Sequence, residues 1–143
     1  MDTRLYFMLA KAENAMTVYI KKQLSLAGLK VSPGQLGILF LLKDRNGQTM
    51  SELSAALETD NSAVTRAVDR LEKSGLAVRQ MNLNDRREYH IVITEQGINE
   101  TGKAIPVIAA VNALIDSEFT KDEVDIFRSV ITRMNCMFNT FRK

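Results

Sequence analysis

The sequence predicts a mostly α-helical fold with one small antiparallel β-hairpin, and three observations support this. Apolar residues recur at helical spacing through most of the 143 residues. Residues 76–80 and 89–93 instead alternate apolar and polar side chains, as half-buried strands do. Residues 49–52 and 120–123 each have the Thr-x-x-Glu pattern of a capping box, which marks a helix start. Together these patterns place helices on both sides of a central hairpin.

The N-terminal third predicts two helices. Residues 3–27 carry apolar side chains at helical spacing, and Gly28 is expected to end that helix. Ser32 and Pro33 predict the start of the next one, because proline suits the first helical position. Residues 44–47, Asp-Arg-Asn-Gly, then predict a turn.

The segment from Thr49 to Gly75 predicts two short helices joined by a tight turn. Residues 58–61, Glu-Thr-Asp-Asn, interrupt the apolar pattern with residue types that favour turns and helix starts. The second helix is expected to run to Ser74, with Gly75 in the left-handed conformation that ends many helices. Its buried stripe is expected to be Val64, Val68 and Leu71. This is the sequence form of a helix-turn-helix.

The predicted hairpin follows directly, so it would form a wing beside the helix-turn-helix. Residues 81–88 are too many for a tight two-residue turn, and the tip should therefore project. Tyr89, Ile91 and Ile93 should share one face of the second strand.

The C-terminal third predicts two further helices. Thr94 should cap the first, which Pro106 should kink rather than end. The last helix, opened by Thr120, is apolar on more than one stripe, which predicts a partner surface. The alternative is a helix deeply buried within one monomer. Its apolar residues are Val124, Ile126, Phe127, Val130, Ile131, Met134, Met137, Phe138 and Phe141.

The polar face of the second short helix and the wing tip are candidates for contacts with double-stranded DNA. An arginine can grip guanine or a phosphate, and an arginine on a projecting tip can enter a narrow minor groove. Asp85 is expected to orient a wing arginine. The alternatives are an ordinary solvated helix face and an ordinary charged loop. The candidate DNA-binding residues are Ser62, Ala63, Thr65, Arg66, Arg70, Lys73, Arg86 and Arg87.

These segments resemble the MarR family of winged helix-turn-helix transcription regulators. The likeness is carried by residues 53–57, 64–76, 84–87 and 93–97. It places the family's Asp-x-Arg wing signature on Asp85, Arg86 and Arg87, which makes Arg87 the expected minor-groove residue. His90 stands where related proteins commonly carry an aliphatic residue, and we expect it to face outward.

The resemblance implies one domain, 1–143, with residues 1–31 and 98–143 forming a helical homodimerisation region around a DNA-binding region, 32–97. It implies a repressor of a pseudo-palindromic promoter site, possible release by a small amphipathic or aromatic effector, and no assigned pocket residues. A transcription activator and a redox-responsive regulator using Cys136 are alternatives, although its apolar neighbours predict a buried, inert thiol. A helical protein-interaction module without DNA binding is a further alternative.

Composition limits the other possibilities. Nineteen basic residues against seventeen acidic ones give a formal charge of +2, so attraction to DNA should be local and strongly reduced by salt. A single cysteine suits the reducing cytoplasm, and no apolar run is long enough for a membrane span. One histidine and one cysteine, far apart, predict neither an enzyme nor a metal site, and no cofactor motif is present.

Overall fold

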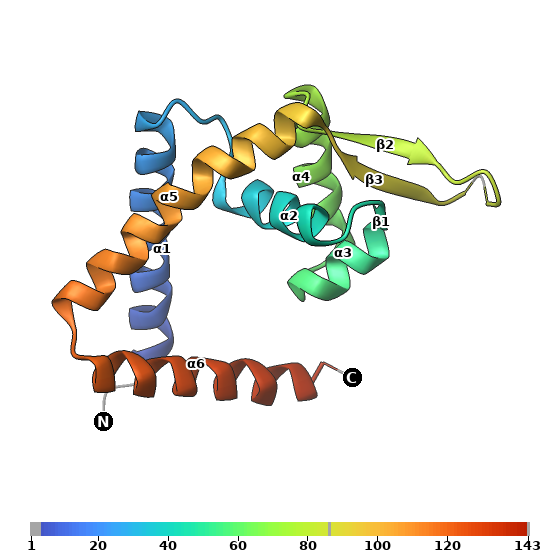
Figure 1. Cartoon of the computed structure of the whole chain (residues 1–143). Helices are drawn as coiled ribbons and strands as arrows, with labels where there is room; N and C mark the ends of the chain where they lie inside the picture. Colours follow the sequence, from blue (N-terminus) through green and yellow to red (C-terminus); the bar gives the residue numbers. More distant parts are fainter. Residues whose placement is uncertain (1–3, 86, 143) are drawn as a thin grey trace. The chain divides into compact units, whose positions relative to one another are not determined.

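The structure is a computed structural model that describes residues 4–85 and 87–142. It divides into two compact units that meet within one helix, between Val107 and Ile108. The predicted mostly helical fold with an antiparallel wing is confirmed. The elements in chain order are α1 (Leu5–Leu26), α2 (Pro33–Asp44), β1 (Gln48–Thr49), α3 (Met50–Leu57), α4 (Asn61–Lys73), β2 (Ala77–Met81), β3 (Tyr89–Ile93), α5 (Glu95–Glu118) and α6 (Lys121–Thr140) (Figure 1).

The helix boundaries follow local chemistry. The predicted capping boxes at the starts of α3 and α6 are formed, and α2 has a third one, between Ser32 and Gln35. Gly28 and Gly75 have φ angles of +78° and +75°, the left-handed conformation expected of residues that end helices. Glu58 takes a left-handed φ of 53° at the end of α3, which turns the chain toward α4.

The core of the first unit lies among α2, α3, α4 and the sheet. The predicted stripe of α4 is confirmed, since Val64, Val68 and Leu71 are each at most 1% exposed. They are buried with fully enclosed side chains from α1, α2, α3 and β3, namely Leu24, Leu36, Ile38, Leu39, Leu42, Leu53 and Ile91. This packing fixes which side of α4 faces outward.

The sheet has three strands in the order β1-β3-β2, one more than the sequence predicted. β1 contains only two residues, too few to show an alternating pattern. Gln48 pairs with Ile91, and the Gln48 side chain donates to the carbonyls of Leu41 and Arg45 at 2.8 and 2.7 Å. Through its pairing with β3 and the Gln48 side chain, β1 therefore connects the end of α2 to the wing.

The expectation that His90 faces outward is wrong. Its ring is partly buried, and Nδ1 lies 2.7 Å from the carbonyl oxygen of Gly47. The reason is β1, which pairs with β3 and brings the turn before it against His90. His90 thus contacts the turn that precedes the helix-turn-helix and connects it to the wing.

The first turns of α5 pack closely on the winged helix. Thr94 caps the helix as predicted, because its hydroxyl accepts from the amide of Gly97 at 3.0 Å while donating to the carbonyl of Gly75 at 2.7 Å. A Cβ at Gly97 would lie 2.2 Å from the carbonyl oxygen of Leu76. Pro106 lies inside α5 and does not end it. The predicted division between a DNA-binding region, 32–97, and a dimerisation region that begins at residue 98 concerns a second copy of the chain, so it stays a prediction.

The second unit comprises the end of α5 and all of α6. None of the described residues of α6 is buried within the single chain. Its large apolar side chains are exposed, with Ile126 at 65%, Phe127 at 58% and Phe138 at 57%. The prediction of a buried Cys136 is wrong as well, because the thiol is exposed in the single chain like the other described residues of α6.

Among the described residues, no helix has both the length and the hydropathy that a bilayer span requires.

Candidate nucleic-acid interface

The start of α4 is fixed by Asp60. One of its carboxylate oxygens accepts from the Ser62 hydroxyl and from the Ala63 amide, both at 2.7 Å. The Ser62 hydroxyl, followed by the Ala63 amide, lowers the pKa of Asp60 below its ordinary value. The carboxylate is therefore ionised at neutral pH and complements the positive end of the helix dipole.

The outer face of α4 carries the polar residues that the sequence placed there. Ser62, Thr65, Arg66, Arg70 and Lys73 are exposed, and Ala63 is half-buried. The Thr65 hydroxyl donates to the carbonyl of Asn61 at 2.8 Å, as the Ser62 hydroxyl donates to Asp60, so both oxygens remain available as acceptors. Neither Arg66 nor Arg70 forms an ion pair within the described part of the chain. Their guanidinium groups are open to an external acceptor.

Arg79 on β2 joins the wing to α4, a connection that sequence reasoning missed. Its guanidinium lies 2.6 Å from the carboxylate of Asp69 and also pairs with Glu72. The Arg79 amide donates to the Glu72 carboxylate at 3.1 Å. Asp69 is half-buried, and its carboxylate is turned to the wing instead of lying on the outer polar face of α4. The available signal was the three-residue spacing of two acids on one helix face.

The two carboxylates of this cluster stabilise the charged form of Arg79. Partial burial alone would lower the pKa of Arg79, but the hydrogen bond to Asp69 and the charges of Glu72 and Asp69 outweigh it and raise that pKa overall. The guanidinium stays charged at any physiological pH. The relative placement of α4 and the wing therefore depends on a permanent ion cluster.

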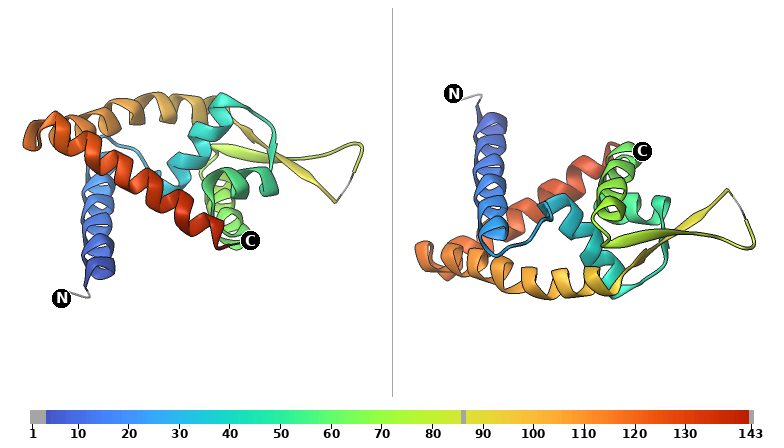
Figure 2. Two further views of the ribbon diagram at one scale, coloured as in Figure 1. Left: turned by 90° about the horizontal axis from the view of Figure 1, so that it is seen from below. Right: turned by 90° about the horizontal axis from the view of Figure 1, so that it is seen from above.

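The loop between β2 and β3 is closed by hydrogen bonds across its base. The Asn82 amide donates to the carbonyl of Glu88 at 3.0 Å, and the Asn82 side-chain amide donates to the Glu88 carboxylate at 3.3 Å. The Asn82 side-chain oxygen accepts from the amide of Asn84 at 2.9 Å. These bonds hold the described residues on both sides of the loop, 82–85 and 87–88, at the end of a hairpin that projects beyond α4 (Figure 2).

Asp85 and Arg87 form a pair within this loop. The Asp85 carboxylate accepts from the Arg87 amide at 3.0 Å and lies 3.5 Å from Arg87 Nε. The Arg87 side chain is nevertheless 94% exposed. Its guanidinium is therefore oriented by Asp85 and presented to solvent. Arg86, the other predicted wing contact, lies outside the described residues.

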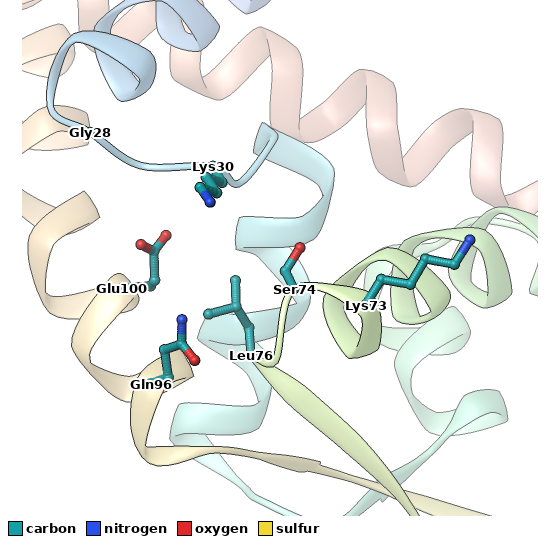
Figure 3. Close-up of a pocket in the computed structure, with 7 residues that line it drawn as sticks. All are labelled: Gly28, Lys30, Lys73, Ser74, Leu76, Gln96 and Glu100. Atoms are coloured by element: carbon teal, nitrogen blue, oxygen red, sulfur yellow. The ribbon is translucent and has the colours of Figure 1, made fainter.

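A hollow of about 310 Å³ lies between the α1–α2 loop, the end of α4 and the first turns of α5. Figure 3 shows the side chains of Lys30 and Glu100 directed toward it and that of Lys73 directed away. Apart from Leu76, the lining is polar or glycine, so the hollow offers little surface to an aromatic ring. Lys73 belongs to the exposed end of α4 instead.

Comparison with known proteins agrees with the geometry. The sequence model described as the MarR family matches residues 31–89. The uncharacterized HTH-type transcriptional regulator YwhA of Bacillus subtilis (strain 168) is 30% identical over 85% of this chain and 91% of its own length. Two further curated matches, at 35% and 33% identity, span only 41% and 61% of the relatives' own lengths.

Solved structures share the fold. The Staphylococcus aureus MepR–DNA complex superposes with a TM-score of 0.84 at 17% identity, covering 95% of this chain and 99% of that one. The organohalide-sensing regulator RdhR-CbdbA1625, in its 2,4-dichlorophenol-bound form, gives a TM-score of 0.86 at 19% identity, covering 93% and 78%. The fold, the interface geometry and the sequence relatives agree: this chain belongs to the MarR family of winged helix-turn-helix transcriptional regulators.

Proposed function

We propose that this chain acts as a homodimeric repressor that binds a pseudo-palindromic DNA site. The observation that carries the proposal is the outer face of α4. Its opposite face is sealed by Val64, Val68 and Leu71, while Arg66 and Arg70 are exposed without ion pairs within the described residues. Cationic groups on a face that the core does not use suit a polyanionic partner.

In this proposal α4 enters the major groove. Residues near the N-terminus of a recognition helix reach base edges, which assigns base contacts to Ser62, Thr65 and Arg66 and a methyl contact to Ala63. The Ser62 and Thr65 hydroxyls donate within the helix start, so they would accept from exocyclic amino groups. Arg70 and Lys73 lie further along the same helix and would contact phosphates.

The wing supplies the minor-groove contact. Arg87 is held by Asp85 and is almost fully exposed at the end of the hairpin, where the negative potential of a narrow minor groove would attract it. Arg86 is assigned to the same contact on the wing signature alone. Because Arg79 ties β2 to Asp69 and Glu72, helix and wing would approach DNA as one body.

The dimer is proposed to form through residues 1–31 and 98–143. Both regions expose more large apolar side chains than a monomer ordinarily leaves uncovered: Leu5, Tyr6, Phe7 and Met8 on α1, and Ile126, Phe127, Phe138 and Phe141 near the C-terminus. A two-fold dimer would place the two α4 helices about 34 Å apart, one turn of B-form DNA.

Release by a small aromatic effector completes the proposal. The fold is shared with a regulator solved with 2,4-dichlorophenol bound. An effector would act by favouring a spacing of the two DNA-binding lobes that no longer matches the groove repeat. A titration with 2,4-dichlorophenol should release operator DNA if this chain responds to phenols.

The central test is a DNA-binding titration at several salt concentrations, using duplexes selected from the source genome by the protein itself. Arg87→Ala should weaken binding by about 1–3 kcal/mol and reduce the slope of log K against log salt by about one. The control is Lys103→Ala, which removes one positive charge, as Arg87→Ala does, but from the exposed side of α5. It should change neither the affinity nor the salt slope. Thr65→Ala and Arg66→Ala should alter which sites are preferred.

Two results would contradict the proposal. No salt-dependent affinity for any duplex would favour the protein-interaction module instead. Equal losses across all sequences for Thr65→Ala and Arg66→Ala would leave α4 with phosphate contacts only and remove its role in base readout.

A further inference from the structure

Leu83 is the most exposed large apolar side chain in the described part of the molecule. It lies in the loop between β2 and β3 and is 94% exposed. Single exposed leucines are common on protein surfaces, so exposure alone implies nothing. What distinguishes Leu83 is the way its loop holds it.

The residues on either side of Leu83 are fixed to each other. The Asn82 side-chain oxygen accepts from the Asn84 amide at 2.9 Å, and Asn82 is bonded to Glu88 across the base of the loop. The backbone therefore turns tightly around Leu83 and leaves its side chain directed to solvent. An apolar group held away from the core in this way contributes nothing to the stability of the single chain.

The same loop presents Arg87. Asp85 orients that guanidinium, and both residues belong to the closed turn that contains Leu83. A wing that delivers Arg87 to the minor groove therefore carries Leu83, four residues earlier in the same loop, close to the duplex as well. Proteins that bind the minor groove often insert a leucine or another apolar side chain between base steps, which unstacks them and bends the DNA.

We propose that Leu83 is an apolar wedge that enters the minor groove beside Arg87 and bends the duplex at that point. The inference rests on the proposed contact between the wing and DNA. It adds a source of specificity that no hydrogen bond supplies, because pyrimidine–purine steps such as TA and CA unstack most easily. Sites selected by the protein should therefore be enriched in those steps where the wing lies.

The test compares three variants of the full-length protein on one selected duplex that carries a dye at each end. Leu83→Ser removes the wedge, Leu83→Met keeps an apolar side chain, and Val78→Thr removes an exposed apolar group elsewhere on the wing. Affinity and its salt slope come from anisotropy, and DNA bending comes from energy transfer between the dyes.

Leu83→Ser should weaken binding about tenfold, since that corresponds to withdrawing much of one leucine from an apolar contact. The bend should decrease as well, while the salt slope should not change because no charge is lost. Leu83→Met and Val78→Thr should behave as the parent protein does.

The outcomes separate this inference from the proposed function. Parental affinity and bending in Leu83→Ser, together with weakened binding in Arg87→Ala, would overturn the wedge and leave the wing contact intact. Parental behaviour in both variants would reject the wing contact itself. A change in the sedimentation of DNA-free Leu83→Ser would place the side chain in a contact between protein copies and would also overturn the wedge.

Discussion

The carboxylate of Asp69 on α4 lies 2.6 Å from the guanidinium of Arg79 on β2, so an ion pair joins the helix and the wing of the DNA interface. The turn at Gly75 supplies the covalent connection, but a turn alone leaves the angle between two elements adjustable. With Glu72 as the second partner of Arg79, the cluster holds β2 at two points on α4. Several consequences of the structure can be measured.

Arg79→Ala should uncouple the wing from α4. The free energy of unfolding should fall by about 1–3 kcal/mol, because charged hydrogen bonds are lost and two carboxylates are left facing each other. DNA affinity should fall by more than the loss of folded protein accounts for. Urea unfolding measures the stability of the variant, and fluorescence anisotropy measures its DNA affinity. Arg79→Lys keeps the charge but not the two-pronged geometry, so it should restore only part of the affinity. Equal affinity in Arg79→Ala and the parent would mean that the wing is positioned without the cluster.

Asp60 should make the start of α4 sensitive to acid. Its folded pKa is lowered, chiefly by the Ser62 hydroxyl and next by the Ala63 amide, below the ordinary value of 3.8. The stabilisation is therefore complete above that ordinary value and is lost as the pH falls through the lower folded pKa. Asp60→Asn keeps a good helix cap that does not titrate. Its urea midpoint should consequently change less than that of the parent between neutral pH and about pH 3. Identical acid profiles would exclude this contribution.

Gly97→Ala should destabilise the protein even though alanine favours helices. Its Cβ would lie 2.2 Å from the carbonyl oxygen of Leu76 and 2.7 Å from Cγ1 of Ile93, so the start of α5 would have to shift. Overpacking of this kind costs about 1–3 kcal/mol. Gly102→Ala on the same helix meets nothing within 4 Å and should stabilise by up to about 1 kcal/mol. Thermal unfolding of the two variants would compare them directly, and opposite signs are the expected result.

Phe127→Glu should separate the proposed dimer without unfolding the chain. The side chain is 58% exposed in the single chain, so a charge there meets water in the monomer but would be buried between two copies. The dissociation constant of the dimer, measured by sedimentation equilibrium, should rise by at least about tenfold. Thr132→Glu, which introduces the same charge at an exposed polar position of α6, should leave the dimer intact. Monomeric behaviour of the parent would reject the dimer outright.

Local patterns accounted for most of the elements. The capping box at Thr49, the end of α4 at Gly75 and the stripe of Val64, Val68 and Leu71 each involve residues a few positions apart, so the sequence carries their full signal. The exposed arginines of α4 and the wing loop were found in the same way. Their assignment to base or phosphate stays a prediction, because it depends on a partner.

Pairing over longer distances was set by the tertiary structure. The contacts of Arg79 with Asp69, ten residues away, and of His90 with Gly47, forty-three residues away, have no periodic signature. β1 is a strand because it pairs with β3, and its two residues are too few to show a pattern of their own. The exposure of Cys136 in the single chain likewise has no local signature, since its apolar neighbours in sequence predict burial.

The sequence by itself determined where the helices and the two wing strands lie and which helix faces are apolar, since hydrogen bonds and side-chain spacing within a few residues decide those features. Only the tertiary structure decided how the wing is held against α4 and which polar residues face outward. Those outcomes depend on which distant groups come together when the core closes.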